Sequence, residues 1–531
     1  MNAIVTPLID QKVSQPKKGE RAVMERSGRE PLGLWIQVGL LAGPFMSMID
    51  SSVVNVALPT MAATLHSSLA GVQWVASAYL LALGLGTTAT AFVAKRWGTR
   101  QVYGMSLAGF TIVSALCAAA PTLGLLIALR VLEGLFGALI VPLAMNMLLG
   151  DGRARSQMSP AAGMALFLAP ALGPALGGLA IAWSGWPLVF LINVPVGLVA
   201  LVAARHIPAD LGPGVTVGAS FDWAGFGFLA VGMVAVSWGT ATAPTQGWLA
   251  QDVWPFVAGG ALSLLGYGLW AARSRRPIVD LRLLKARGAL LSLGLIAVVS
   301  VVTFAMIFLA PAFMQDVEGQ TAATAGLALL PQGLVTGLGI WIGMGLADRW
   351  GLGRTVVVGM VLLTLGTVGL LAISSTSSPV EIATILCGRA FAIGLVIQPL
   401  LTHLIDRLPD HQVADANTLF NLVERVAGTL GIAAIVTLFQ HQEEVRTQSV
   451  LERLHLPPSL MAHPAAARDL HLSAASLGRL GAAATLGLHD VVWWVVGFSV
   501  LGLTLAWGIA RRGIGPAQAP SMSTETRERL P

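Results

Sequence analysis

Residues 34 to 58 read LWIQVGLLAGPFMSMIDSSVVNVAL, an apolar run with one charged side chain, Asp50. A helix of about 20 residues crosses the roughly 30 Å hydrocarbon core of a bilayer. The run is longer than the apolar core of a cleavable signal peptide, which has about 7 to 15 residues. We therefore predict an uncleaved first membrane span, preceded by a polar and basic tail at 1–33.

The whole chain has the composition of a membrane protein. Of its 531 residues 55% are hydrophobic and 11% are charged, whereas soluble domains have roughly 25% charged residues. Thirteen further apolar runs follow the first one, so we predict an all-α integral membrane protein with 14 transmembrane helices in a lipid bilayer. The expected spans are 34–58, 74–94, 102–120, 123–149, 160–182, 187–204, 223–243, 254–272, 289–314, 325–346, 355–374, 380–404, 417–440 and 491–510.

Lysine and arginine are unevenly distributed between the loops that join these runs. They gather at 1–33, 95–100, 153–155, 273–287 and 349–354, and none occurs at 59–73, 121–122, 183–186, 244–253, 315–324 or 375–379. Cytoplasmic loops of membrane proteins are enriched in these two residues. The alternation predicts an even number of spans with both termini in the cytoplasm.

Two features recur at nearly the same spacing along the chain. The stretch AKRWG at 94–98 returns as ADRWG at 347–351, and Arg130 in the fourth span has a counterpart, Arg389, in the twelfth. A parallel duplication produces such a repeat. We predict a tail at 1–33, a six-helix bundle at 34–205, two inserted helices with cytoplasmic loops at 206–288, a second six-helix bundle at 289–512 with a long external loop at 441–490, and a tail at 513–531.

Three charged side chains of the expected spans, Asp50, Arg130 and Glu133, lie at a similar depth when residues are counted at 1.5 Å each. Charged groups at that depth cost about 2.5 to 3.5 kcal/mol each, which makes them functional candidates. A buried carboxyl group beside an arginine can bind a proton on one side and release it on the other. Alternatively, Arg130 and Glu133 pair only with each other or with backbone groups.

The loop at 343–351, GMGLADRWG, follows a pattern known from one transporter superfamily. It resembles the Gly-x-Leu-Ala-Asp-Arg-x-Gly-Arg-Lys signature of the major facilitator superfamily, which serves there as a gating latch against neighbouring helices. The copy after the second span departs from it, because Lys95 stands where the signature has an acid. Alternatively, either loop is only a short basic turn on the cytoplasmic side, as the positive-inside rule requires, and has no gating role. The gating residues implied by the resemblance are Arg96, Gly98, Arg100, Asp348, Arg349 and Gly351.

Residues 169–178, APALGPALGG, resemble the motif that antiporters of this superfamily carry in their fifth helix. Glycines four residues apart permit close helix contact, and prolines remove backbone donors and bend a helix, which suits a rocking hinge. Alternatively, these small residues only allow the helices to pack closely and have no role in the transport mechanism. The residues of this antiporter motif are Pro170, Gly173, Pro174, Gly177 and Gly178.

Two further stretches, DSSVVNVALP at 50–59 and FLINVPVG at 190–197, are similar to the fourteen-span drug:proton antiporters of the EmrB and QacA type. The resemblance implies a major facilitator fold and the export of hydrophobic, often cationic drugs in exchange for protons, driven by the proton gradient without a cofactor. It also implies the bacterial inner membrane and, by analogy at 441–490, a periplasmic adaptor protein and an outer-membrane channel. A proton-coupled symporter or facilitator for a specific metabolite shares the fold and stays the alternative.

Other classes of protein find no support in the sequence. No Gly-Lys pair exists for an ATP-binding loop, and no HExxH or GxSxG enzyme motif occurs. The net charge of +6 reflects the basic loops, so we expect no nucleic-acid partner. We predict that the protein is not an enzyme and has no catalytic, cofactor or metal site. Asp415, Glu424 and Arg425 are interpreted as a solvated helix start, with a second ionisable site as the alternative.

Overall fold

The computed structural model describes residues 34–149, 160–208, 221–247, 249–274, 277–279, 281, 284, 288–405, 410–454 and 474–511. Within these residues the chain is helical and contains no strand. The helices are α2 (Leu34–Thr64), α3 (Leu69–Trp97), α4 (Thr99–Ala118), α5 (Leu123–Leu149), α6 (Pro160–Ser184), α7 (Pro187–Leu191), α8 (Asn193–Ala204), α9 (Trp223–Gln246), α10 (Trp254–Arg273), α11 (Ala289–Asp316), α12 (Ala322–Leu329), α13 (Pro331–Trp350), α14 (Leu352–Gly369), the 3-10 turn η3 (Leu370–Ala372), α15 (Pro379–Ile405), α16 (Asp410–Leu454) and α18 (Ala474–Arg511).

The described helices have the length and surface of membrane spans. Thirteen of them, with α7 and α8 counted as one and α12 and α13 as another, are long and apolar enough to cross a bilayer, and α6 contains a shorter apolar segment at Leu172–Ser184. Large apolar side chains remain exposed around the bundle, including Trp183, Leu262 and Trp341. Lipid, rather than water, suits such a surface. The expected all-α membrane fold is confirmed.

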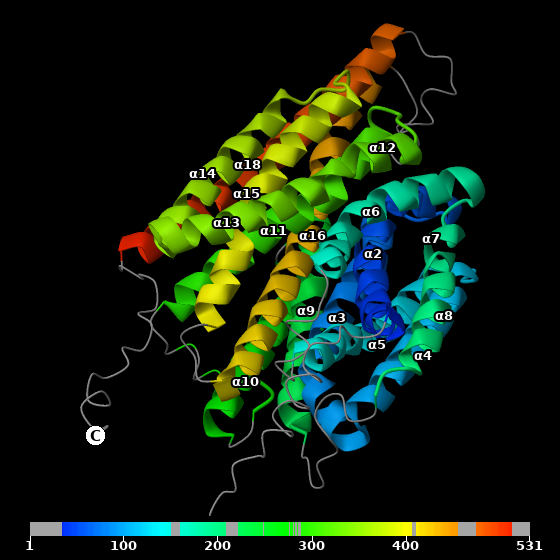
Figure 1. The fold of residues 1–531 in the computed structure, drawn as a ribbon. Coiled ribbons are helices and arrows are strands. Elements are labelled where there is room, and N and C mark those ends of the chain that lie inside the picture. Colours follow the sequence, from blue (N-terminus) through cyan, green and yellow to red (C-terminus); the bar gives the residue numbers. More distant parts are fainter. Residues whose placement is uncertain are drawn as a thin grey trace, which may run out of the picture.

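Two groups of helices, α2 to α8 and α11 to α18, repeat the same packing, and both can be followed in Figure 1. In the N-terminal group α3 packs on α5, α2 on α6 and α4 on α8. In the C-terminal group α13 packs on α15, α11 on α16 and α14 on α18, which are the equivalent pairs in chain order. The duplication expected from the sequence is therefore present in the packing of the helices.

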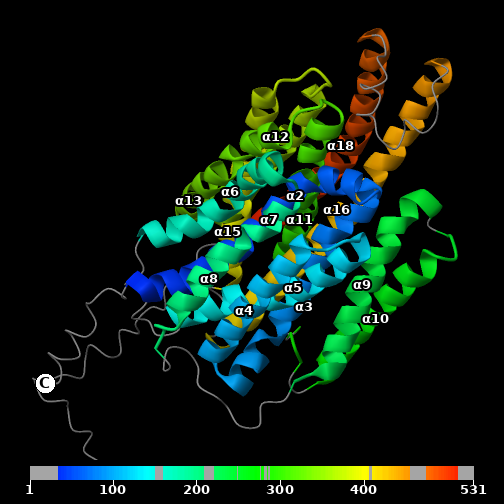
Figure 2. The ribbon, with the colours of Figure 1, turned by 90° about the vertical axis from the view of Figure 1, so that its right-hand side faces the viewer.

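The two groups meet along equivalent helices. Helix α6 packs against α12 and α13, and α16 packs against α3. The inserted helices α9 and α10 form a hairpin whose first helix also contacts α16 and α3, at one side of the two groups (Figure 2). Asp222 precedes the first residue of α9 and stabilises the hairpin. Its carboxylate accepts hydrogen bonds from the Gly225 amide and from the Trp270 indole, each at 2.9 Å.

The last two long helices differ from their expected bounds. The sequence predicts a loop at 441–490, but α16 continues to Leu454 and α18 already begins at Ala474. The two extensions run together beyond the other helices in Figure 2. Arg446 of α16 forms an ion pair of 2.8 Å with Asp490 of α18. Polar helical residues of this kind escape a search for apolar runs, which explains the difference.

Candidate functional site

The three charged residues predicted to share one depth meet in a buried cluster between α2 and α5. Arg130 donates from one terminal nitrogen to Asp50 Oδ2 at 2.7 Å and to Glu133 Oε2 at 2.8 Å. Its Nε donates to the Val75 carbonyl oxygen of α3 at 3.1 Å. The exposed fraction is 1% for Arg130 and 0% for both acids. Glu133 therefore pairs with Arg130, as in the alternative interpretation, but Asp50 joins the same guanidinium.

Local packing places Arg130 against α3 and α7. A Cβ at Gly134 would lie 2.6 Å from the Tyr79 carbonyl oxygen, so only glycine lets α5 approach α3 this closely. The guanidinium carbon of Arg130 lies 3.9 Å from the centre of the Tyr79 ring and 5.5 Å from that of Phe190. Aromatic faces attract a guanidinium at these distances. The cluster is thus enclosed by helix contacts and aromatic rings.

Polar side chains of other helices complete the surroundings of the two acids. Asn193, the first residue of α8, donates to Asp50 Oδ1 at 2.9 Å and to Ser114 Oγ at 3.0 Å. The thiol of Cys117 on α4 contacts Glu133 Oε2 at 3.4 Å. The sequence places Asn193 in a motif without indicating its role, and it gives Cys117 no partner at metal-ligand spacing. A polar residue next to a buried acid becomes visible only when the helices are assembled.

The equivalent arginine of the C-terminal group has a different environment. Arg389 is 3% exposed, and it donates to the Thr367 hydroxyl at 3.3 Å and to the Val302 carbonyl oxygen at 3.1 Å. No carboxylate of the described residues forms an ion pair with it. The repeated arginine is therefore paired with acids in one half only.

The residues of the two expected gating loops lie at the ends of helices. Gly98 and Gly351 have φ angles of 88° and 83°, which glycine adopts without strain, and each ends one helix and begins the next. The guanidinium of Arg100 donates to the Arg205 carbonyl oxygen at 2.8 Å and so joins α4 to the end of α8. The exposed residues are Arg96, Asp348 and Arg349, for which no ion pair occurs among the described residues.

The small residues of the expected antiporter motif lie where helices touch. A Cβ at Gly177 would lie 2.8 Å from the Val53 carbonyl oxygen of α2, and one at Gly173 would overlap the Ser52 hydroxyl. A Cβ at Gly178 would overlap the Ala322 carbonyl oxygen of α12, across the contact between the two groups. The same contact brings the carbonyl oxygen of Pro174 against Gly326 of α12. Pro170 lies in the same helix, but its side chain is outside the described residues.

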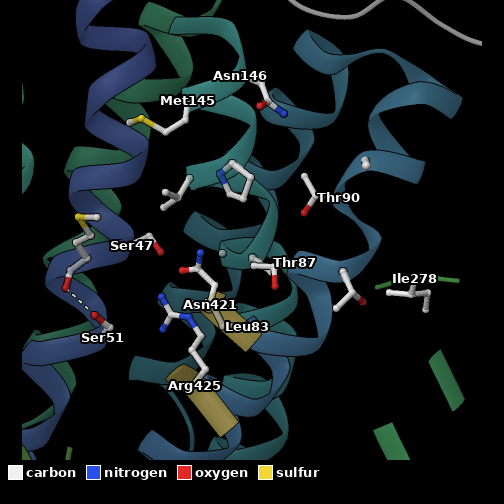
Figure 3. Close-up of a pocket in the computed structure, with 17 residues that line it drawn as sticks. Ser47, Ser51, Leu83, Thr87, Thr90, Met145, Asn146, Ile278, Asn421 and Arg425 are labelled. Atoms are coloured by element: carbon white, nitrogen blue, oxygen red, sulfur yellow. Dashed lines mark hydrogen bonds between the residues drawn. The ribbon is translucent and has the colours of Figure 1, made fainter. Parts of the chain in front are cut away.

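A cavity of about 280 Å³ lies between the N-terminal group and α16 (Figure 3). Its walls come from the middle of α2, the second half of α3, the second half of α5, the first part of α16 and Ile278 after α10. The cavity therefore extends from the middle of these helices toward the end of the bundle at which α2 begins. The polar side chains of its lining are Ser47, Ser51, Thr87, Thr88, Thr90, Asn146, Asn421 and Arg425.

One contact joins this cavity to the buried cluster. Ser47 lines the cavity, and its hydroxyl lies 3.4 Å from the Tyr79 hydroxyl. The ring of Tyr79 in turn covers the guanidinium of Arg130. A change in the wall of the cavity can thus reach the acids through two side chains.

Arg425 does not fit the solvated helix start that the sequence favours. The structure instead places it in the wall of the cavity, although Glu424 does not line that wall. The side chain of Asp415 is outside the described residues. The sequence does contain a signal, because Asn421 and Arg425 are four residues apart and share one face of a helix. The hydrophobic run around them gives no reason to prefer that face.

Two bundles of six spans, a buried ion cluster and a cavity between the bundles define a transporter embedded in the lipid bilayer. The sequence profile of the Major Facilitator Superfamily matches residues 40–432. The chain therefore belongs to the Major Facilitator Superfamily.

Two proteins with similar sequences are named for drug resistance or export. The chain is 30% identical to the multidrug resistance protein B homolog of Mycobacterium tuberculosis over 90% of this chain and 88% of that protein. It is 31% identical to the tetracenomycin C resistance and export protein of Streptomyces glaucescens, over 76% of this chain and 75% of the relative. These matches confirm the resemblance to drug-efflux members that the motifs indicated.

Solved structures support the same fold. A bacterial homolog of the human lysosomal transporter Spinster, in an inward-facing and unoccupied conformation, superposes with a TM-score of 0.60 at 16% identity, over 92% of this chain and 100% of that one. A D-xylose–proton symporter superposes with a TM-score of 0.56 at 13% identity, over 89% and 96%. At these identities the likeness concerns the fold alone.

Proposed function

We propose that this protein exports hydrophobic drugs across the bacterial inner membrane in exchange for protons. The observation that carries the proposal is the buried cluster, in which two carboxylates face a single guanidinium. The names of the relatives support drug export. No ATP-binding loop occurs in the sequence, so the proton gradient is the proposed source of energy and no cofactor is needed.

The charge of the cluster explains how it would carry a proton. Asp50, Glu133 and Arg130 together have a formal charge of −1 when both acids are ionised. An uncompensated charge in a buried site is costly. One added proton makes the cluster neutral, so the protonated form can return to the cytoplasmic side without substrate, whereas the form with neither proton nor substrate moves less readily. Asn193 remains as a donor to Asp50 in the unprotonated form.

Coupling to the substrate would pass through Ser47 and Tyr79. A substrate in the cavity touches the wall to which Ser47 belongs, and Ser47 contacts the tyrosine that covers Arg130. Displacement of Tyr79 changes the contacts that hold the guanidinium against its two acids. Substrate binding and proton binding would thereby become alternatives, as exchange requires.

The direction of transport follows from the position of the cavity. It lies toward the end at which α2 begins, which is the cytoplasmic end if the basic loops obey the positive-inside rule. Both termini are then cytoplasmic. Toward the opposite end α6 and α12 are in close contact, because Gly178 and Gly326 bring backbone against backbone there. A drug would enter from the cytoplasm and leave after this contact opens.

An adaptor protein remains part of the proposal for cells with two membranes. The extensions of α16 and α18, joined by Arg446 and Asp490, form the described surface that reaches farthest beyond the other helices (Figure 2). A periplasmic adaptor leading to an outer-membrane channel would bind there.

The proposal is tested with purified protein in liposomes under an imposed pH gradient and a panel of neutral, cationic and anionic fluorescent dyes. The wild-type protein is expected to accumulate at least one dye against its gradient. Asp50→Asn is expected to lose this accumulation and to retain downhill dye movement, because an asparagine side chain is close in shape to aspartate but cannot bind and release a proton.

Asp490→Asn is the matched control, since it makes the same chemical change at a surface ion pair whose aspartate is 32% exposed. It should transport like the wild type. Normal accumulation by Asp50→Asn would sink the assignment of the proton site. A gradient that drives dyes in the same direction as protons would favour the symporter alternative.

A further inference from the structure

We propose that the cavity binds amphipathic organic anions, such as aromatic carboxylates or phenolates, and that Arg425 is their ion-pair partner. This inference rests on the proposed export function and names its substrate class. It departs from the expectation of often cationic drugs. Its basis is the charge of the cavity wall together with the position of Arg425 in that wall.

The cavity has a positive and no negative group in its described lining. Arg425 is its one charged residue, and no aspartate or glutamate belongs to the wall. Figure 3 shows Arg425 beside Asn421, both projecting from α16 toward the side of the cavity where Ser47 and Ser51 of α2 lie. A guanidinium in a partly enclosed site has a strong preference for a carboxylate, which can accept two parallel hydrogen bonds.

No acid of the described residues forms an ion pair with Arg425. Asp50 and Glu133 both pair with Arg130, and neither forms an ion pair with Arg425. Glu424, the next residue along α16, is near enough for its charge to interact with that of Arg425, but it does not line the cavity and forms no ion pair with Arg425 among the described residues. The Nε of Arg425 is buried without a hydrogen-bond partner. This unpaired donor is the second observation that points to an anionic ligand.

Arg425 lies where α16 packs against α3. A Cβ built at Gly84 of α3 would lie in van der Waals contact with the Cβ of Arg425, at 3.5 Å. The arginine thus stands at the contact between the two groups of helices. A ligand bound to it touches both groups at once, which is the position that a transported molecule must occupy.

The remaining wall defines the rest of the ligand. Leu83, Val141, Met145 and Ile278 supply apolar surface. The threonines of α3 donate their hydroxyl hydrogens to backbone carbonyl oxygens of the same helix. Small-molecule pockets in proteins have volumes of about 300 to 1,000 Å³, and this cavity of about 280 Å³ is near the lower limit. A compact aromatic body with one acidic group fits this combination. A lipophilic cation would meet the guanidinium without a counter-charge.

The test is equilibrium binding to the purified full chain in detergent, which does not require coupled transport. Three fluorescent naphthalene compounds serve as probes, with a carboxylate, a carboxamide or a trimethylammonium group on the same ring system. The wild type is expected to bind the carboxylate at least tenfold more tightly than the cation. Arg425→Gln should raise the Kd of the carboxylate at least tenfold and change that of the carboxamide less than threefold. Arg425→Lys should recover part of the loss.

The carboxamide also reports whether the variant retains its fold. Arg511→Gln is the matched control, because Arg511 lies at the end of α18 over Trp507 and far from the cavity wall in sequence and contacts. It should bind all three probes like the wild type. Tightest wild-type binding of the cation, or a carboxylate Kd that Arg425→Gln leaves unchanged, overturns the substrate class.

The binding and transport experiments distinguish a failure of the export function from a failure of the proposed substrate class. Cation binding together with proton-driven export leaves the export function intact and removes only the role of Arg425. Carboxylate binding that depends on Arg425, without any proton-driven movement of that probe in liposomes, supports the substrate class and contradicts drug:proton exchange.

Discussion

A methyl group added to Gly326 tests whether the contact between α6 and α12 closes one side of the transport path. In the structure a Cβ at this position would overlap the carbonyl oxygen of Pro174 and would lie 2.8 Å from its carbonyl carbon. Both atoms belong to the backbone of α6, so no side chain can rotate away. We expect Gly326→Ala to separate the two helices and to favour the arrangement that is open on this side.

The size of the effect follows from the contact. Non-bonded carbon atoms rest at about 3.5 to 4.0 Å, so the helices must move apart by about 1 Å. Overpacking of this kind costs about 1 to 3 kcal/mol. The cost falls on the closed arrangement alone, which shifts the equilibrium between closed and open forms by about 5- to 150-fold.

Distances between nitroxide labels measure this equilibrium. Suitable positions are Trp183 of α6 and Leu334 of α13, whose side chains are exposed on the two sides of the contact. Gly326→Ala should add or enlarge a population at longer distance and slow drug transport. Gly337→Ala is the control, because a Cβ there would meet nothing within 4 Å. An unchanged distance distribution with normal transport in Gly326→Ala would refute the reasoning.

Two further predictions concern charged groups. Arg130→Lys should lower the free energy of unfolding by about 1.5 to 3 kcal/mol and abolish coupled transport, since one ammonium cannot reproduce the bonds to Asp50, Glu133 and Val75; a variant with wild-type stability and coupling would contradict this. Burial, followed by the charge of Glu381, raises the pKa of Glu318 to about 7. Because the folded protein then favours the protonated acid, it loses stability as the pH rises from the ordinary pKa of 4.5 to the raised pKa of about 7. Glu318→Gln should therefore be more stable than the wild type at pH 8, by about 1 to 2 kcal/mol after allowance for its partial exposure, and similar to it below pH 4.5. Thermal unfolding at both values checks this, and equal stability at pH 8 is the opposing result.

The spans and the buried cluster can be predicted from the sequence because each depends on local properties. Apolar runs give the spans, and counting residues along helices places Asp50 and Arg130 at one depth. The cost of burying charge then leaves few ways to arrange them. The structure brings them within 2.7 Å of each other.

Features that depend on contacts between distant helices cannot be predicted in the same way. Asn193 becomes a partner of Asp50 only because α8 packs on α2. Arg425 lines the cavity only because α16 crosses to the N-terminal group and packs on α3. The helical extensions that hold Arg446 against Asp490 lack the apolar signal by which the other helices are found.

In the proposed function the Asp50 cluster couples the inward movement of protons to the export of substrate. The most direct test adds a transported dye to one side of liposomes that contain the purified protein and a trapped pH indicator, without an imposed pH gradient. The account predicts that protons move opposite to the dye in the wild type and that the dye moves without protons in Asp50→Asn. Proton movement that persists in Asp50→Asn, or that follows the dye in the wild type, would contradict it.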